Sequence, residues 1–282
     1  MNLIFQYMIV DERCDQRGPI PEVKDRKRSE VYKQCADESA HSFGLYARKI
    51  GVDHIYSTEG EYINRFESLS STILLFEVLR IIYDRDFDKY DKILFADTDI
   101  ICNTEENIFD LCNEKDVYGV LESDIGNGKV KHGIYNTWDR SEKSYNDIVS
   151  MYERNDVPIC PAIPNENSVY PSKVFMMNTG VMVWSRDARL RAREVFDDWY
   201  SWYKDGVENN APFWCMNDQP FISGQLMKHG FSIGNLPQTW NDSPPHYDSW
   251  DDWKDQNFLH YTGGFGKKQL IDDVWFGAFK YL

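Results

Sequence analysis

Two aspartates separated by a single residue, Asp97 and Asp99, follow the continuous apolar run at residues 93–96. Hard divalent cations prefer oxygen ligands, and two carboxylates spaced in this way at the end of a strand can face one cation. Two ionised carboxylates this close together are also costly without a neighbouring positive charge. An Asp-x-Asp pair by itself is common in solvated loops, so its position after an apolar strand is what makes it a candidate metal site.

The segments around this pair alternate between strand and helix patterns. Continuous apolar runs are typical of strands covered on both faces, and their alternation with helices predicts an α/β fold, a mostly parallel sheet with helices on both sides. Ligands of such sheets bind at the carboxyl ends of the strands, where the acid pair lies. The predicted strands are residues 2–10, 52–56, 90–101, 116–121 and 175–184, and the predicted helices are residues 29–50, 69–83, 188–204 and 217–229.

The charge of the chain limits its partners. The formal net charge is -15 and the pI is about 4.8. An acidic surface repels nucleic acid and anionic lipid, so neither is an expected partner. A phosphate-bearing small ligand stays compatible with this charge, because a bound cation or a few lysines can reverse the potential inside one cleft. The oligomeric state is left open.

The cysteines and the apolar segments predict a compartment. None of the 6 cysteines are spaced as Cys-x-x-Cys, which argues against a zinc site. Scattered cysteines in a chain without an export signal indicate reduced thiols. The first ten residues lack the basic region of a signal peptide, and no segment has the length of an integral membrane span. We therefore expect a soluble, cytoplasmic protein.

Five short segments resemble, in the same order, motifs of the glycogenin-like retaining enzymes, glycosyltransferase family eight, which have the GT-A fold. The ordered set is more specific than any of its members and spans most of the chain. The segments are residues 46–51 (the helix end before the second strand), 90–101 (the Asp-x-Asp strand), 176–183 (the Asn-Ser/Thr-Gly-Val strand), 217–219 (the Asp-Gln motif) and 260–267 (the His-Phe/Tyr-x-Gly…Lys segment).

The chain departs from the family pattern at two points. The family lysine usually lies six residues after the histidine, but that position is Gly266 here, and Lys267 and Lys268 follow it. The family also often has a Lys or Arg, facing the diphosphate, early in the helix before the Asp-x-Asp strand. Residues 70–73 read Ser-Ser-Thr-Ile instead, so either no residue takes this diphosphate-facing role or Arg65 takes it.

The resemblance implies a Rossmann-like GT-A domain over residues 1–282, with a nucleotide-binding half at 1–125 and a half for the donor sugar and the acceptor at 126–282. It implies metal-dependent transfer of a sugar from a nucleotide-sugar to a hydroxyl of a glycan or other acceptor, with retention of configuration. A UDP-linked donor is favoured over a GDP-linked one by analogy alone.

The resemblance also assigns roles to residues. Asp97, Asp99 and His260 would bind manganese or magnesium, and Lys267 would approach the diphosphate. Asp218 and Gln219 would lie beside the reacting carbon of the sugar as catalytic residues. The other donor-binding candidates are Tyr7, which would stack on the base, Gln6 and Ile9 beside it, Thr98 between the two acids, Asp124 and Asn178 for the sugar, and Gly263, Gly264 and Gly266, which would let the backbone come close to phosphate.

Plainer interpretations exist for several of these residues. Gln6, Tyr7 and Ile9 could all belong to the core. His260 could be a half-buried structural histidine, Asp218 could be a helix N-cap and Asn178 a turn residue. Sugars stack on aromatic rings, so the weak candidates for acceptor binding are Trp240, His246 and Trp250.

Three other functions compete with a retaining transferase. An inverting GT-A enzyme would need a carboxylate base, for which Glu122, Asp218 and Asp242 are available. A nucleotidyltransferase would normally carry a Gly-rich loop after the first strand, which residues 10–14 lack. A non-catalytic sugar-binding protein would have a degenerate donor site, whereas the acids, the histidine and the lysine are intact here.

Overall fold

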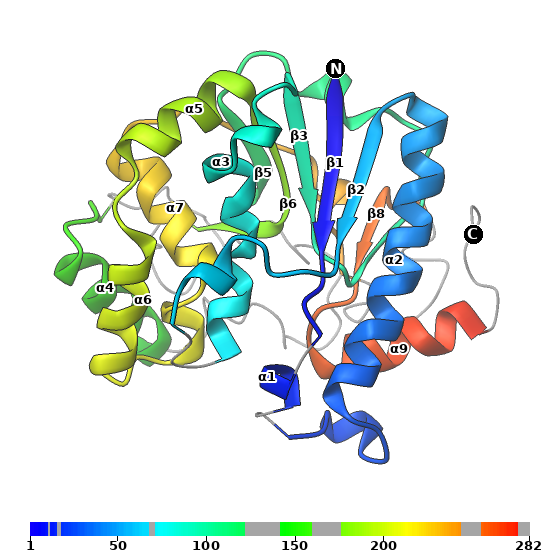
Figure 1. Ribbon diagram of the computed structural model, residues 1–282, viewed down its shortest axis with the longest axis horizontal. Coiled ribbons are helices and arrows are strands. Elements are labelled where there is room, and N and C mark those ends of the chain that lie inside the picture. Colours follow the sequence, from blue (N-terminus) through cyan, green and yellow to red (C-terminus); the bar gives the residue numbers. More distant parts are fainter. Residues whose placement is uncertain are drawn as a thin grey trace.

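The computed structural model describes residues 1–10, 12–15, 18–67, 71–121, 142–159, 176–243 and 255–275. Within these residues a six-stranded sheet has the order β2-β1-β3-β6-β5-β7 (Figure 1). Strand β6 is antiparallel to both of its neighbours, while the other pairs are parallel. The predicted mostly parallel α/β fold is therefore confirmed. The strands are β1 (Asn2–Tyr7), β2 (Asp53–Ser57), β3 (Lys92–Ala96), β5 (Val117–Leu121), β6 (Met177–Ser185) and β7 (Ile233–Asn235).

Helices cover both faces of this sheet. Helices α2 and α9 lie on one side, and α3, α5, α6 and α7 lie on the other (Figure 1). The α-helices are α1 (Glu12–Asp15), α2 (Arg28–Ile50), α3 (Arg80–Tyr83), α4 (Glu142–Arg154), α5 (Arg186–Val195), α6 (Trp199–Glu208), α7 (Asp218–Lys228) and α9 (Gly263–Trp275); the 3₁₀ helices are Pro21–Val23, Ile63–Arg65, Ser71–Leu79, Arg85–Phe87, Ile108–Leu111, Phe213–Cys215 and Gln238–Trp240. No helix of the described residues is both long and apolar enough to cross a membrane.

Strand β1 shows why the apolar runs are continuous. Leu3 and Phe5 are fully buried in the core cluster on the α3/α5/α7 side, whereas Ile4 is fully buried in the cluster that contains Phe43 and Tyr46 of α2. Successive side chains of a strand point to opposite faces, so a strand covered on both faces needs apolar residues at every position. Burial of each such side chain contributes about 1.5–3 kcal/mol.

The predicted strand at residues 90–101 is in fact two strands in different sheets. Strand β3 ends at Ala96, and β4 (Ile100–Cys102) pairs antiparallel with β8 (Phe258–His260) in a separate two-stranded sheet. Asp97 and Asp99 form the connection. The Asp97 N–H donates to the Gly180 carbonyl of β6 at 2.8 Å, and the Asp99 carbonyl accepts from Tyr261 N–H at 2.8 Å. Both sheets therefore anchor the backbone of the acid pair.

The helix predictions need two corrections. The single helix expected at residues 188–204 is divided into α5 and α6, because Phe196 is extended and the Asp198 side chain caps α6 by accepting from Tyr200 N–H and Ser201 N–H. The helix expected at 69–83 is a 3₁₀ helix from Ser71 to Leu79 that continues as α3. The sequence patterns also missed α4, β7, β8 and α9.

Candidate metal centre

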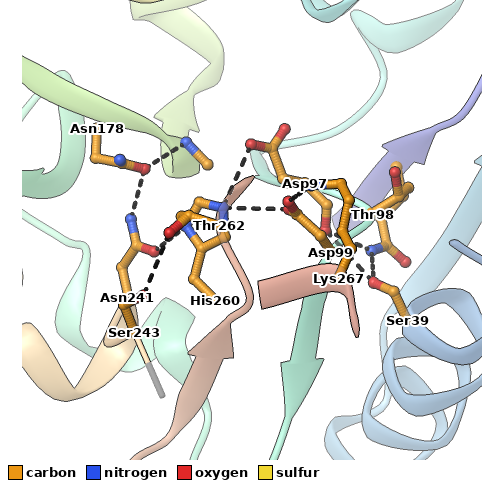
Figure 2. Close-up of polar contacts among 12 residues, drawn as sticks. Ser39, Asp97, Thr98, Asp99, Asn178, Asn241, Ser243, His260, Thr262 and Lys267 are labelled. Carbon is orange, nitrogen blue, oxygen red and sulfur yellow. Dashed lines mark hydrogen bonds and ion pairs between the residues drawn. The ribbon is translucent and has the colours of Figure 1, made fainter. Parts of the chain in front are cut away.

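Three side chains from distant parts of the chain meet at the carboxyl end of β3. One ligand atom each from Asp97, Asp99 and His260 all lie within 4.8 Å of one another. The His260 Nε2 atom is 3.1 Å from Asp99 Oδ1 and 3.8 Å from Asp97 Oδ2 (Figure 2). Pairing of β4 with β8 produces this contact, since His260 is the register partner of Ile100, the residue after Asp99.

Lys267 joins the cluster from α9. Its Nζ donates to Asp99 Oδ2 at 2.6 Å and lies 5.3 Å from the centre of the Tyr32 ring. Its side chain is 15% exposed, whereas that of Lys268 is 47% exposed and pairs with Asp272 at the surface. Of the two lysines that the sequence left as alternatives, only Lys267 contacts the acid pair in the described structure.

The electrostatics of the cluster are those of a site short of positive charge. Burial, followed by repulsion from Asp99, raises the pKa of Asp97 to about 6. Burial alone would also raise the pKa of Asp99, but Lys267 and His260 outweigh it and hold that pKa well below its usual range. Burial opposes protonation of His260, but the two carboxylates prevail and raise its pKa. Two carboxylate oxygens and one imidazole nitrogen form a donor set that suits manganese, and magnesium when phosphate and water supply the remaining ligands.

A second set of buried groups holds the backbone of Asp97. The Gln6 side chain donates from Nε2 to Ser39 Oγ at 2.8 Å and to the Asp97 carbonyl at 3.3 Å. Its Oε1 accepts from His54 Nε2 at 3.0 Å, and burial, followed by Arg48, lowers the pKa of His54 to about 4. Gln6 is fully buried, as its plainer interpretation as a core residue expects, and its side chain supports the turn that carries Asp97 and Asp99. That it borders a nucleotide base stays a prediction.

Tyr7 and Ile9 lie at and just after the end of β1. The Tyr7 hydroxyl donates to the Leu75 carbonyl at 2.7 Å, and its ring stacks on that of Phe95. Burial and then the charges of Asp218 and Asp97 raise the pKa of Tyr7. The Tyr7 hydroxyl is therefore close to the acids of the site, while Ile9 is buried in the core. Stacking of Tyr7 on a base stays a prediction.

Asp218 and Gln219 are the first two residues of α7, and both side chains are largely buried. The N-cap is Asn217, whose side chain accepts from Gln219 N–H at 3.2 Å, so the alternative of Asp218 as the cap is wrong. Burial, followed by the charge of Asp97, raises the pKa of Asp218 to about 7, although a hydrogen bond with Thr179 opposes the shift. The carboxyl group of Asp218 therefore lies close enough to Asp97 to feel its charge, and its pKa falls near neutral pH.

This raised pKa predicts a pH-dependent stability. Asp218 is protonated in both states below its unfolded pKa. Between that pKa and about 7 only the unfolded state loses the proton, so the free energy of unfolding falls over this window and levels off above it. We expect Asp218→Asn to gain about 2–3 kcal/mol relative to the parent between pH 5 and pH 8. Urea unfolding of the metal-free proteins measures the difference. The control is Asp37→Asn, which removes an exposed acid from α2. Parallel plots of unfolding free energy against pH for the Asp218 variant and the parent would contradict the prediction.

The remaining candidates are placed as follows. Thr98 Oγ donates to Met8 Sδ at 3.6 Å. Gly263 has φ +69°, a left-handed conformation that favours glycine, and a Cβ on Gly266 would lie 2.5 Å from the Tyr261 backbone. Backbone conformation at Gly263 and close packing at Gly266 therefore explain why both positions at the start of α9 are glycine. Their approach to phosphate stays a prediction.

Several other predicted contacts are corrected or fall elsewhere. His260 is buried rather than half-buried, and Trp240 is a core residue at 2% exposure, so it does not bind acceptor at the surface. Arg65 is exposed at the end of its 3₁₀ helix. Asp124, Glu122, His246 and Trp250 lie outside the described residues.

Sequence reasoning missed two residues of the site, Ser39 and Asn241. Ser39 Oγ donates to the Asp97 carbonyl at 3.4 Å, and Asn241 Oδ1 is 2.8 Å from His260 Nδ1. Ser39 lies on a buried face of α2 and Asn241 follows a 3₁₀ helix, so neither stands in a motif. Ser39 could have been noticed in the sequence only as a polar residue on the apolar face of a predicted helix, because a buried polar group needs a hydrogen-bond partner.

No protein-family model matches the chain, and no curated protein matches it in sequence. Solved structures are similar in fold. A glycosyltransferase involved in the glycosylation of the major capsid of PBCV-1 matches at 14% identity and a TM-score of 0.51, over 96% of this chain and 98% of that one. The galactosyltransferase LgtC, in complex with donor and acceptor sugar analogs, matches at 12% identity and a TM-score of 0.45, over 100% of this chain and 97% of that one. Mouse xyloside xylosyltransferase 1 matches at 12% identity and a TM-score of 0.44, over 92% of this chain and 97% of that one. At such identities a likeness concerns the fold alone, and the match with a TM-score of 0.51, together with the sheet order, supports the GT-A architecture of this chain.

Proposed function

We propose that this protein is a metal-dependent glycosyltransferase that moves a sugar from a UDP-linked donor to a hydroxyl group of a glycan or other acceptor. The observation that carries the proposal is the convergence of Asp97, Asp99 and His260 at the carboxyl end of β3 in a GT-A fold. The capsid glycosyltransferase of similar fold supports the reaction class. A chance cluster of acids would not explain why a buried histidine and a partly buried lysine complete it.

Asp97, Asp99 and His260 would hold manganese or magnesium. The cation would supply Lewis-acid neutralisation of the charge that grows on the departing diphosphate. Lys267 would contribute a fixed positive charge to the same oxygens, since its ammonium already lies beside Asp99. Gln6 and Ser39 would keep the acid pair in place through the Asp97 carbonyl.

Asp218 and Gln219 would act on the donor sugar. Asp218 lies near Asp97 and Tyr7, because the charge of Asp97 raises the pKa of Asp218 and the charge of Asp218 raises the pKa of Tyr7, so its carboxyl group borders the cluster of Asp97, Asp99 and His260. We propose retention of configuration, in which the departing diphosphate assists the acceptor hydroxyl. An inverting reaction would need a free carboxylate base, and Asp242 is poorly suited to it because it is buried and its Oδ1 accepts from Gln238 and Ser243.

Calorimetry with UDP in the presence and absence of Mn²⁺ tests the proposal. A metal-dependent affinity for UDP is expected, and its absence would contradict a nucleotide-sugar site. A screen of nucleotide-sugars for metal-dependent hydrolysis then identifies the donor, and turnover separates an enzyme from a sugar-binding protein. Release of pyrophosphate from a sugar phosphate and a nucleoside triphosphate would instead indicate a nucleotidyltransferase. NMR of the anomeric proton of the product decides between retention and inversion.

A further inference from the structure

A buried chain of amide groups leads from the backbone of β6 to the imidazole of His260. Asn178 Oδ1 is 2.8 Å from Gly180 N and 2.8 Å from Asn241 Nδ2, and Asn241 Oδ1 is 2.8 Å from His260 Nδ1 (Figure 2). Asn241 is fully buried and Asn178 and His260 nearly so. We call Gly180, Asn178 and Asn241 the amide relay. Its far end contacts the ring nitrogen that points away from Asp97 and Asp99.

The direction of every hydrogen bond in the relay follows from its first member. The Gly180 backbone nitrogen can only donate, so the Asn178 atom beside it must be the carbonyl oxygen. That oxygen can only accept, so Asn241 must present its NH₂ group to Asn178. The Asn241 carbonyl oxygen therefore faces His260, and Nδ1 of His260 must carry a proton. An amide flip at either asparagine would place two donors or two acceptors 2.8 Å apart.

The packing of Gly180 keeps the imidazole in this orientation. A Cβ at position 180 would lie 2.5 Å from His260 Cε1, 3.0 Å from His260 Nδ1 and 2.8 Å from Asn178 Oδ1. The ring and the relay therefore need the bare backbone of Gly180, and the same residue accepts from Asp97 N–H through its carbonyl. One glycine thus links the acid pair, the relay and the histidine.

We propose that Asn241, supported by Asn178 and Gly180, is a positioning residue that holds the proton of His260 on Nδ1 and leaves Nε2 as the atom that ligates the metal. The inference rests on the proposed metal site. Without the relay, the carboxylate of Asp99 at 3.1 Å would favour a proton on Nε2, which would block coordination. Partners that orient a ligating histidine from its other nitrogen are worth about 10–100-fold in metal affinity.

NMR of the histidine ring nitrogens in the whole protein tests the proposal. In the metal-free protein at pH 6, we expect a hydrogen-bonded His260 Nδ1 proton that exchanges slowly with water. With saturating Mg²⁺, the Nδ1 proton is expected to persist while Nε2 carries none. A Mg²⁺-loaded protein with the proton on Nε2 would overturn the proposal. Retention of the Nδ1 signal without affinity for Mg²⁺ or Mn²⁺ would instead reject the proposed function and leave the relay as a structural feature.

Two variants of Asn241 separate positioning from folding. Asn241→Leu removes the acceptor, so the slow Nδ1 proton is expected to disappear and the Kd for Mn²⁺, measured by calorimetry without nucleotide, to rise by about 10–100-fold. Asn241→Asp loses the NH₂ group that donates to Asn178 but keeps an oxygen opposite Nδ1, so the Nδ1 signal should survive and the loss of affinity should be smaller than in Asn241→Leu. Asn155→Leu is the control, since the Asn155 side chain bonds to the Met151 carbonyl at the end of α4. Equal Mn²⁺ affinities for Asn241→Leu and the parent would refute the role.

Discussion

Replacement of Asp99 by asparagine is expected to reduce metal-dependent sugar transfer by about two to three orders of magnitude. Asp99 contacts both His260 and Lys267, and it is the acid whose pKa the neighbours hold lowest, so it carries most of the negative charge of the cluster. Asparagine keeps the size of the side chain and removes that charge. Steady-state turnover across a Mn²⁺ titration, with the donor identified by the hydrolysis screen, measures the effect.

The matched control for this substitution is Asp37→Asn. It removes one carboxylate of the same type from the exposed surface of α2, where Asp37 pairs with Lys33. The control should keep parental turnover and Mn²⁺ dependence. Circular dichroism and urea unfolding of both variants exclude loss of fold as the cause. Turnover of the Asp99 variant at the parental rate, with unchanged Mn²⁺ dependence, would remove the metal site from the proposal.

Replacement of Lys267 by methionine should change the affinities for metal and for nucleotide in opposite directions. The Lys267 ammonium is bonded to Asp99 and repels any cation beside it, so its removal is expected to tighten Mn²⁺ binding without nucleotide by about tenfold. The same change would remove the proposed charge-assisted hydrogen bond from Lys267 to the diphosphate, worth about 1.5–3 kcal/mol, so UDP binding with Mn²⁺ should weaken by about 10–100-fold. Calorimetry of the two titrations gives both values.

Lys268→Met provides the paired control one residue further along α9. Lys268 is bonded to Asp272, four residues later, at the surface, and its replacement should leave both affinities within about twofold of the parent. A loss of UDP affinity in Lys268→Met that equals or exceeds the loss in Lys267→Met would assign the diphosphate to the other lysine. Weaker Mn²⁺ binding in Lys267→Met would show that the ammonium supports the metal site rather than competing with it.

The local patterns of the sequence were sufficient for the parts of the fold that local burial dictates. The apolar runs of β1 and β3 identified strands covered on both faces, and Gly51, in a left-handed conformation with φ +72°, ends α2 as expected of a helix stop. Pro220 falls in the first turn of α7, where its missing N–H has no helical partner to lose. These features depend on a few neighbouring residues, so the chain displays them directly.

The errors occurred where tertiary contacts override local pattern. The run at 90–101 has the composition of one strand, but the chain leaves the main sheet at Asp97. There Gly180 of β6 and Tyr261, the residue after β8, bind the backbone of the acid pair. The stretch at 71–79 has helical periodicity but forms a 3₁₀ helix, and there Leu75 accepts from Tyr7 and the buried Glu77 carboxylate from Ile63 N–H. No local periodicity reports such contacts.

The sequence by itself determined that two carboxylates would follow a buried strand of an α/β sheet. Apolar runs, and their alternation with helical patterns, can be identified from the order of the residues alone. Only the tertiary structure decided which polar groups meet those carboxylates. His260 arrives through the pairing of β8 with β4, and Asn241, in no recognisable motif, decides which nitrogen of that histidine holds the proton. The physical reason is that hydrogen-bond direction and charge pairing depend on atoms brought together by the whole path of the chain, whereas hydrophobic periodicity depends on neighbours along it.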